Sequence, residues 1–298
     1  MINRNVPEIN NSQSAGNTAV SDRNESGKAM DIMKCGVTTI SKDKSIYDII
    51  KILVEKKITG LPVVDDTGPV GIISEKDILK LMFKEEFISG CAEDYMTRNI
   101  ITFEEDDNLS EICDCLIDNA FRRVPILHQN KLVGIISRAD LIKANKDKFK
   151  PQSAIKKPLK EKKSLTARDI MKCGLITVQR QTPIHEAIEI LATRNITGLP
   201  VVDEYMNLLG IVSEKDILKL LYHPEVKPGN AEDFMTEDVV SFNHDDSLFD
   251  VCNCLLNNNF RRVPILNQGK VIGIISRTDI MVYALKNKSA FSAHINRK

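Results

Sequence analysis

The stretch Gly71–Leu79, Gly-Ile-Ile-Ser-Glu-Lys-Asp-Ile-Leu, decides the fold, because close variants of it occur four times in the chain of 298 residues. The other copies begin at Gly134, Gly210 and Gly273. Each copy reads as an apolar strand that runs into a helix start, with a serine and an aspartate three residues apart. Four copies at near-constant spacing predict four structural units of one kind.

The four units form two doublets. Within the first doublet Gly71 corresponds to Gly134, an offset of 63 residues. The Asp-Ile-Met-Lys-Cys-Gly that begins at Asp31 returns at Asp169, an offset of 138 residues. A unit of about 60 residues is near the lower size for a domain that folds alone, so we expect paired units to share a core.

Each unit is predicted to be β-α-β-β-α, which makes the chain a mixed α/β protein. In the first unit we expect a strand over residues 37–40, an N-cap at Asp43 and an amphipathic helix that runs to Val54. Strands over residues 61–65 and 70–74 follow, joined by a turn, and residues 75–83 form the second helix.

The repeats divide the chain into seven parts. The first residues are polar and lack apolar periodicity, so we expect a disordered tail. The segment between the doublets is rich in lysine, which favours a solvated linker; a basic strap that touches an acidic partner or nucleic acid is the alternative. The predicted parts are a tail at 1–28, units at 29–88 and 89–146, the linker at 147–166, units at 167–227 and 228–287, and a C-terminal tail at 288–298.

Composition narrows the class of protein. The 41 Lys and Arg residues balance 41 Asp and Glu residues, so no global field draws the chain to nucleic acid or anionic lipid. No apolar run reaches the roughly 18 residues of a membrane helix, and the chain start does not have the pattern of a signal peptide.

Seven cysteines include two C-x-C pairs, at 113/115 and 252/254. Residues two apart on a helix face nearly opposite directions, so we interpret these cysteines as buried small hydrophobic residues, with a metal site as the alternative. Unpaired cysteines of this kind favour a reduced, cytoplasmic protein.

The strand-to-helix junction is the candidate binding site. Free backbone N–H groups at a helix start favour phosphate, a serine hydroxyl can donate to it, and a carboxylate can accept from both hydroxyls of a ribose. The same Ser-x-x-Asp pattern is also a capping box, which needs no ligand, and both interpretations stay open. The candidate residues are Ser74, Asp77, Ser137, Asp140, Ser213, Asp216, Ser276 and Asp279.

Two arginine pairs, Arg122–Arg123 and Arg261–Arg262, each precede a Val-Pro-Ile-Leu strand. Two adjacent arginines cannot both face bulk solvent on an alternating strand, so at least one is expected at the interface between units, where an anion would satisfy it. The alternative is an internal salt bridge to one of three carboxylates, Glu104, Glu105 and Asp106.

The first and third units carry Thr59–Gly60 and Thr197–Gly198 where the others carry arginines. Glycine there permits close approach of backbone to a ligand, or only a tight strand entry. A further hydroxyl is predicted at the end of each first strand, either for the same pocket or as an ordinary strand residue. These residues are Thr39, Thr102, Thr177 and Ser241.

Together these motifs resemble the CBS-domain family. The matching features are the opening Asp-Ile-Met, the Gly-Leu-Pro-Val-Val-Asp or Arg-Arg-Val-Pro-Ile-Leu strand and the closing Gly-Ile-Ile-Ser-x-x-Asp, over nearly all of residues 29–285. In that family two units pair into a Bateman module with two clefts, two modules commonly stack into a flat disc, and the clefts bind adenosyl ligands. The resemblance implies that the four aspartates contact ribose and that the four serines lie at the helix starts.

In layout the chain is similar to the gamma subunit of AMP-activated protein kinase, whose basic residues before the strand proline hold phosphates. The arginine pairs match that placement, whereas the Thr-Gly pairs do not. Phosphate binding by the first and third units is therefore either absent or dependent on arginines from their neighbours.

We expect a non-catalytic sensor that binds AMP, ADP, ATP, S-adenosylmethionine or a dinucleotide as a regulatory ligand and signals to an effector protein. No cofactor or metal is expected, and the disc is formed either by the two modules of one chain or by a homodimer. Outside the four units no segment is long enough for a catalytic domain, and no Walker-type loop occurs. The alternatives are a ligand-free assembly scaffold and a protein that binds nucleic acid through the lysine-rich linker.

Overall fold

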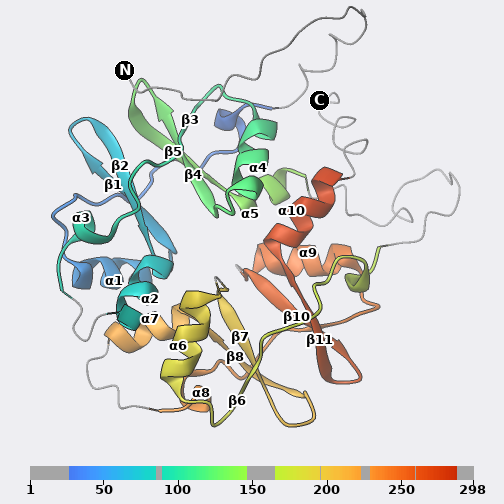
Figure 1. The fold of residues 1–298 in the computed structure, drawn as a ribbon. Helices are drawn as coiled ribbons and strands as arrows, with labels where there is room; N and C mark the ends of the chain where they lie inside the picture. The colour runs from blue at the N-terminus through green and yellow to red at the C-terminus, as the bar shows by residue number, and fades with distance from the viewer. Residues whose placement is uncertain are drawn as a thin grey trace, which may run out of the picture.

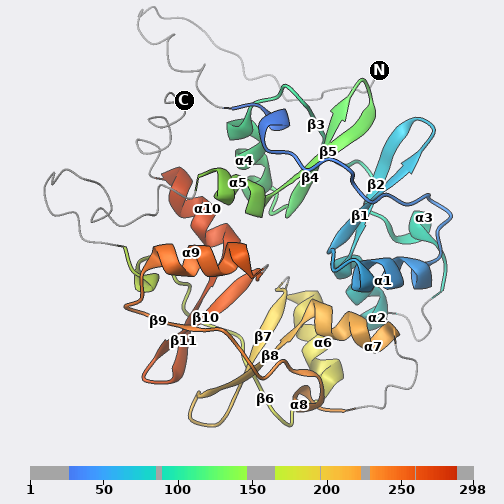
Figure 2. The same cartoon turned by 180° about the vertical axis from the view of Figure 1, so that it is seen from behind.

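The computed structural model describes residues 27–84, 89–145, 165–194, 196–222, 229–258 and 260–286. Four small sheets, each flanked by helices, confirm the mixed α/β class. The four units lie around a common centre (Figure 1), and the view from behind shows the same arrangement (Figure 2). Among the helices of these residues, none has the length and apolar character needed to cross a membrane. The flat disc stays a prediction.

Most of the predicted tails and linker lies outside the described residues. The last two residues of the predicted tail, Gly27 and Lys28, are nevertheless ordered. Leu109 donates its backbone N–H to the Gly27 oxygen at 3.0 Å, and Lys28 forms a β-bridge with Asn108. Gly27 and Lys28 thus belong to the folded part of the chain, because they pair with the second unit.

The first doublet has the expected order of elements. A 3₁₀ helix η1 (Ala29–Asp31) precedes α1 (Ile46–Glu55), β1 (Gly60–Asp65), β2 (Gly68–Ser74) and α2 (Glu75–Lys84). The second unit contains α3 (Ala92–Tyr95), β3 (Phe103–Glu104), α4 (Leu109–Asp118), β4 (Arg123–His128), β5 (Lys131–Ser137) and α5 (Arg138–Ala144).

The second doublet repeats this order. The third unit contains η4 (Ala167–Asp169), β6 (Val178–Gln179), α6 (Ile184–Thr193), β7 (Gly198–Val202), β8 (Leu208–Ser213) and α7 (Glu214–Tyr222). The fourth contains α8 (Ala231–Phe234), β9 (Phe242–Asn243), α9 (Leu248–Asn257), β10 (Arg262–Asn267), β11 (Lys270–Ser276) and α10 (Arg277–Lys286).

Each sheet contains an antiparallel hairpin, and in three of the four sheets a short parallel strand lies beside it. The strand orders are β3-β4-β5, β6-β7-β8 and β11-β10-β9. In the first unit the strand predicted over residues 37–40 is reduced to one parallel bridge between Ile40 and Val63. The hairpin is the constant part of the unit, and it ends at the Ser-x-x-Asp junction.

The start of α1 differs from the sequence prediction. Ser45, not Asp43, is the N-cap: its Oγ accepts from the Asp48 backbone N–H at 3.1 Å. The helix then buries Ile46 and Leu53 on its apolar face, as the periodicity predicted.

The opening segment of each unit packs on the other unit of its doublet. The Ala29 N–H donates to Asp107 in the second unit at 2.9 Å, and the Ala92 N–H donates to Lys44 in the first unit at 2.9 Å. In the second doublet the Ala167 N–H donates to Asp246 at 2.9 Å and the Ala231 N–H to Thr182 at 2.8 Å. Paired units are therefore linked by two crossed segments.

The glycine that opens each Gly-Ile-Ile-Ser or Gly-Ile-Val-Ser motif makes room for a methionine from the crossed segment. A Cβ on Gly71 would lie 2.5 Å from the Met96 Sδ and 3.0 Å from the Thr97 oxygen. The equivalent contacts join Gly134 to Met33, Gly210 to Met235 and Gly273 to Met171. The motif glycine and the opening methionine thus interlock.

The two doublets pack on each other through helices within the single chain. Helix α2 lies against α6 and α7, and α5 lies against α10. Leu79 from α2 is buried in the core of the third unit, and Leu218 from α7 in the core of the first. The second and fourth units share one continuous core. The starts of β4 and β10 consequently face the middle of the molecule (Figure 1).

Candidate functional site

All four Ser-x-x-Asp motifs adopt one geometry at the strand-to-helix junction. The Ser137 Oγ donates to the Asp140 Oδ2 at 2.5 Å, and the Ser137 N–H donates to the same oxygen at 2.9 Å. The Oγ to Oδ2 distance is 2.6 Å in the first unit and 2.5 Å in the third and fourth units. The capping box is formed, and it leaves the second oxygen of the carboxylate for other partners.

In the second and fourth units, a lysine lies next to that second oxygen. Lys34 places its Nζ 3.0 Å from the Asp140 Oδ1, and Lys172 places its Nζ 3.0 Å from the Asp279 Oδ1. Both lysines come from crossed opening segments. The Lys34 side chain is 62% exposed and that of Asp140 is 5% exposed, so the lysine can swing away while the carboxylate stays fixed.

Arg123 and Arg262 start directly opposite the motif serines. Arg123 is the register partner of Ser137 in the β4–β5 hairpin, and Arg262 is the partner of Ser276 in the β10–β11 hairpin. In the first and third units the equivalent partners of the serine are glycines, Gly60 and Gly198.

Both guanidinium groups cross to the neighbouring unit. Arg123 donates to the Thr59 hydroxyl and to the Gly60 oxygen, the latter at 3.2 Å. Arg262 donates to the Thr197 hydroxyl and, at 3.5 Å, to the Gly198 oxygen. The glycine-bearing units therefore receive an arginine from their neighbours, which is one of the two alternatives that the sequence left open.

Burial lowers the pKa of Arg123 to about 10, an effect that Arg261 and Arg122 reinforce and that Glu75 and Asp140 oppose. Burial also lowers the pKa of Arg262 to about 10. Both groups stay protonated at neutral pH, and their hydrogen bonds within the described residues go to uncharged oxygens. Each doublet thus holds a half-buried cation that an anionic ligand group would stabilise.

Arg122 and Arg261 are held differently, by buried carboxylates. Arg122 donates to the Glu214 Oε1 at 2.8 Å, and Arg261 donates to the Glu214 Oε2 at 2.8 Å and to Glu75. Although burial lowers the pKa of Arg261, these two carboxylates raise it above its ordinary value.

The salt bridge that the sequence offered as an alternative therefore exists with other partners. The predicted partners, Glu104, Glu105 and Asp106, were wrong. The arginines instead contact Glu75 and Glu214, because the first residues of α2 and α7 lie at the centre of the molecule. Glu105 lies instead 2.9 Å from the His128 Nδ1.

The predicted second hydroxyls lie before the first strands rather than at their ends. Thr102 immediately precedes β3, whose Phe103 pairs with Ile126, so Thr102 lies toward the Arg123 end of the sheet. The same position before β6 and β9 is half-buried, whereas Thr39 in the first unit is exposed. The residues in question are Thr39, Thr102, Thr177 and Ser241.

The sequence analysis missed two kinds of site residue, the lysines at the aspartates and the glutamates at the centre. Their signal is the difference between units. The residue after the motif serine is glutamate at 75 and 214 but arginine at 138 and 277. A lysine follows the opening methionine at 34 and 172 but a threonine at 97 and 236. Aligning the repeats for their differences would have found both.

The cysteines of the two C-x-C pairs lie on α4 and α9. Cys113 and Cys252 are buried in the core shared by the second and fourth units, as the sequence predicted, whereas Cys115 and Cys254 are only partly buried. No group of three or more potential metal ligands occurs among the residues that the structure describes.

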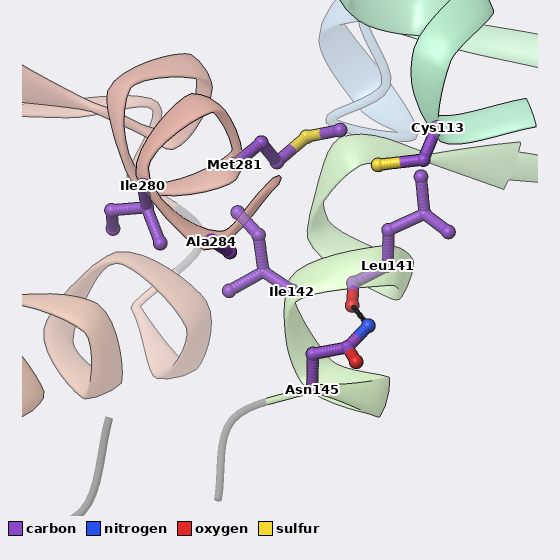
Figure 3. A pocket seen from close by; sticks show the side chains of 7 residues that line it. All are labelled: Cys113, Leu141, Ile142, Asn145, Ile280, Met281 and Ala284. Atoms are coloured by element: carbon purple, nitrogen blue, oxygen red, sulfur yellow. Dashed lines mark hydrogen bonds between the residues drawn. The ribbon is translucent and has the colours of Figure 1, made fainter. Parts of the chain in front are cut away.

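A small depression lies between α5 and α10 (Figure 3). Its lining is apolar except for Asn145, whose Nδ2 donates to the Leu141 oxygen at 2.8 Å. Without a cation it offers nothing to a phosphate. The depression is lined by Cys113, Leu141, Ile142, Asn145, Ile280, Met281 and Ala284.

A comparison with protein families matches the CBS domain model to residues 29–84, 92–147, 167–223 and 231–286. The chain belongs to the CBS-domain family. Members of this family are generally regulatory rather than catalytic. Its four CBS units account for the repeats, and the two doublets are CBS pairs.

Protein MJ1225 of Methanocaldococcus jannaschii is 30% identical over 190 residues, 63% of this chain and 68% of the relative. The crystal structure of this relative, described as a proposed archaeal homologue of the AMP-activated protein kinase gamma subunit, superposes on this chain with a TM-score of 0.76. The two sequences are 22% identical in this comparison, which covers 87% of this chain and 100% of that chain. This chain covers only 61% and 60% of the lengths of two further curated relatives.

Solved structures of single CBS pairs match one half of the chain. CBSX2, a protein of Arabidopsis thaliana, in complex with AMP is 32% identical and covers 41% of this chain and 98% of its own, with a TM-score of 0.39. The CBS pair of protein MJ0100, in complex with 5′-methylthioadenosine and S-adenosyl-L-methionine, is 30% identical and covers 42% of this chain and 100% of its own, with a TM-score of 0.38.

Proposed function

We propose that this chain is a non-catalytic regulatory protein that binds an adenosyl ligand between paired CBS units and signals its presence to an effector protein. The observation that carries the proposal is the arrangement at Asp140 and Asp279. Each is a buried carboxylate at a helix start, and the residue opposite its serine is a half-buried arginine without a carboxylate among its hydrogen-bond partners in the described residues. A ribose and a phosphate need these two groups side by side.

The second oxygen of each carboxylate, which the capping box does not use, suits a ribose. Asp140 uses its Oδ2 for the capping box and its Oδ1 for an exposed lysine. The two hydroxyls of a ribose can replace that lysine, because a surface ion pair is worth only about 0–1 kcal/mol. The aspartates of the other two units, Asp77 and Asp216, have the same box and are proposed as ribose contacts of the facing clefts.

The phosphate is proposed to bind at Arg123 or Arg262. Each guanidinium spans both units of its pair, since it starts on one strand and donates to the threonine and glycine of the other. A phosphate bound there would contact both units and favour one orientation of the pair. A ligand shifts such an equilibrium only by its different affinity for the two orientations, and that difference is what an effector protein would sense.

Calorimetric titration tests the proposal. AMP, ADP, ATP, S-adenosylmethionine and a dinucleotide are titrated into the full chain, and we expect at least one to bind. Asp140→Ala or Asp279→Ala should weaken that binding by about 1.5–3 kcal/mol, the typical value of a hydrogen bond to a charged group.

Asp94→Ala is the matched control, because Asp94 closes the same kind of box at α3 on the exposed surface. Its removal should leave affinity unchanged. Equal losses from Asp94→Ala and Asp140→Ala would show that the aspartates act only through helix capping.

A ligand-free assembly scaffold is the second candidate, and the four completed capping boxes favour it, since each serine and aspartate is satisfied without a ligand. For a scaffold no adenosyl compound gives heat or raises the melting temperature, whereas a ligand at 100 times its Kd stabilises the folded state by about 2.7 kcal/mol. The lysine-rich linker lies outside the described residues, and nucleic-acid binding through it stays a prediction.

A further inference from the structure

The centre of the molecule holds a set of four charges, one from each CBS unit. Glu75 and Glu214 are the first residues of α2 and α7, and their exposed fractions are 2% and 1%. Arg122 and Arg261 precede β4 and β10. The two carboxylates and two guanidinium groups are joined by the hydrogen bonds described above, so this central set crosses from one CBS pair to the other.

The central set is electrically balanced, whereas its surroundings are not. Two glutamates neutralise two arginines. Arg138 donates only to the uncharged oxygens of Thr278 and Leu116, and Arg123 and Arg262 likewise donate only to uncharged oxygens among the described residues. Arg123 and Arg262 also lie close enough to the glutamates to feel them: Glu75 acts on the pKa of Arg123 and Glu214 on that of Arg262. Arg123 and Arg262 therefore each offer a phosphate a guanidinium that has no carboxylate partner among the described residues.

Two guanidinium nitrogens in and beside the central set lack a hydrogen-bond acceptor among the described residues. The Arg122 Nη1 and the Arg262 Nε are buried and have no hydrogen-bond partner within the described part of the chain. A buried donor without an acceptor is costly, so an anion that reached these nitrogens would be stabilised. An anion that extended further would meet the carboxylates of Glu75 and Glu214, which already occupy the other nitrogens.

We propose that Glu75 and Glu214 are specificity residues that limit the negative charge accepted at the centre, so that a monophosphate binds better than a triphosphate. The proposal rests on the proposed function, since it concerns the phosphate end of the same adenosyl ligand. The first phosphate is neutralised by Arg123 or Arg262. Each further phosphate adds charge next to a fixed carboxylate, and like charges in a buried, weakly screened environment repel strongly.

The test compares the ligand series adenosine, AMP, ADP and ATP in the wild type and in Glu75→Gln/Glu214→Gln. Glutamine keeps the shape and one acceptor oxygen but removes the charge. We expect the wild type to bind AMP more tightly than ATP. In the double variant ATP affinity should rise by on the order of tenfold, AMP affinity should rise less, and adenosine affinity should stay unchanged. Glu111→Gln, at an exposed position on α4, controls for the removal of a carboxylate elsewhere on the protein.

Three outcomes would overturn the inference: an equal change for all four ligands, no change for any, or the same gain in Glu111→Gln. Should the double variant fail to fold, Glu75→Gln alone serves, because among the bonds above Glu75 contacts only Arg261. It should show the same order of effects at a smaller size.

A second measurement separates this inference from the proposed function. The melting temperatures of the wild type and the double variant are recorded with inorganic phosphate and with tripolyphosphate. Tripolyphosphate should raise the melting temperature of the variant and not of the wild type. If no adenosyl compound binds the wild type, the proposed function is refuted, and this measurement alone decides the role of the glutamates. Equal shifts in both proteins would refute that role.

Discussion

Replacing Gly71 by alanine probes the interlock between the motif glycine and the opening methionine. The new Cβ would lie 2.5 Å from the Met96 Sδ, 2.9 Å from its Cγ and 3.0 Å from the Thr97 oxygen. Unbonded heavy atoms normally lie about 3.5–4.0 Å apart. The sulfur must therefore move by about 1 Å, although Met96 is only 9% exposed and packs in the core of the first unit.

The Thr97 oxygen cannot withdraw as easily, because it accepts from the Ile72 N–H at 3.0 Å in a β-bridge between the units. Overpacking of a core typically costs about 1–3 kcal/mol, and the fixed carbonyl puts Gly71→Ala at about 2–3 kcal/mol. For a protein of this size each kcal/mol lowers the melting temperature by about 2–4 °C, so we expect a fall of roughly 4–12 °C.

Scanning calorimetry of matched variants checks this value. Gly198→Ala is the control, since its Cβ would come no closer than 3.6 Å to any neighbour and should change stability by less than about 0.5 kcal/mol. Adding Met96→Ala to Gly71→Ala should remove the clash with sulfur but not that with Thr97, giving a favourable coupling of about 1–2 kcal/mol. A melting temperature of Gly71→Ala within about 1 °C of the wild type, or an equal fall in Gly198→Ala, would refute the interlock.

Three further predictions concern other parts of the chain. Ser137→Ala removes the hydroxyl of a capping box and should cost about 0.5–2 kcal/mol of unfolding free energy in a thermal melt, and an unchanged melt would show that this hydroxyl contributes nothing to the box. Iodoacetamide at pH 8 should modify the exposed Cys35 and Cys173 quickly, whereas Cys252 should react only after unfolding, because burial raises its pKa to about 11. Mass spectrometry of the peptides measures the three rates, and an equal rate for Cys252 would refute the prediction. Hydrogen bonds from Asn207 lower the pKa of Asp203, so the contribution of Asp203 to stability is complete above about pH 4 and is lost as the pH falls through the lowered pKa. The difference in melting temperature between the wild type and Asp203→Asn should therefore become smaller from pH 7 to pH 3. A constant difference would contradict this assignment.

The sequence predicted the repeated architecture because it is written in local patterns. The four motif glycines fix the number of units, and the apolar periodicity from Ile46 onward gives the first helix with nearly its observed bounds. The cap at Ser45 was missed because Asp43 is an equally good capping residue two positions earlier. The strand over residues 37–40 was over-predicted, since β propensity does not show how much of a segment finds a partner.

The candidate site was less predictable because its contacts are distant in sequence. Arg122 and Glu214 are 92 residues apart, and Arg261 and Glu75 are 186 residues apart. No local pattern shows that four helix and strand starts meet at one centre. The ion pair between Lys34 and Asp140 could not be predicted for the same reason. In the order of the sequence Lys34 belongs to the first unit, whereas in the structure it contacts the second unit.

The crossed opening segments mean that a single repeat of this protein is too small to be handled separately. A fragment cut at residue 84 would lack the segment around Ala92 and Met96 that covers its core, and would carry an unmatched segment of its own around Ala29. Two copies of such a fragment would complete each other by exchanging these segments, as the units do within the chain. A cut between doublets separates no opening segment from the surface that it covers, but it exposes the core that the second and fourth units share.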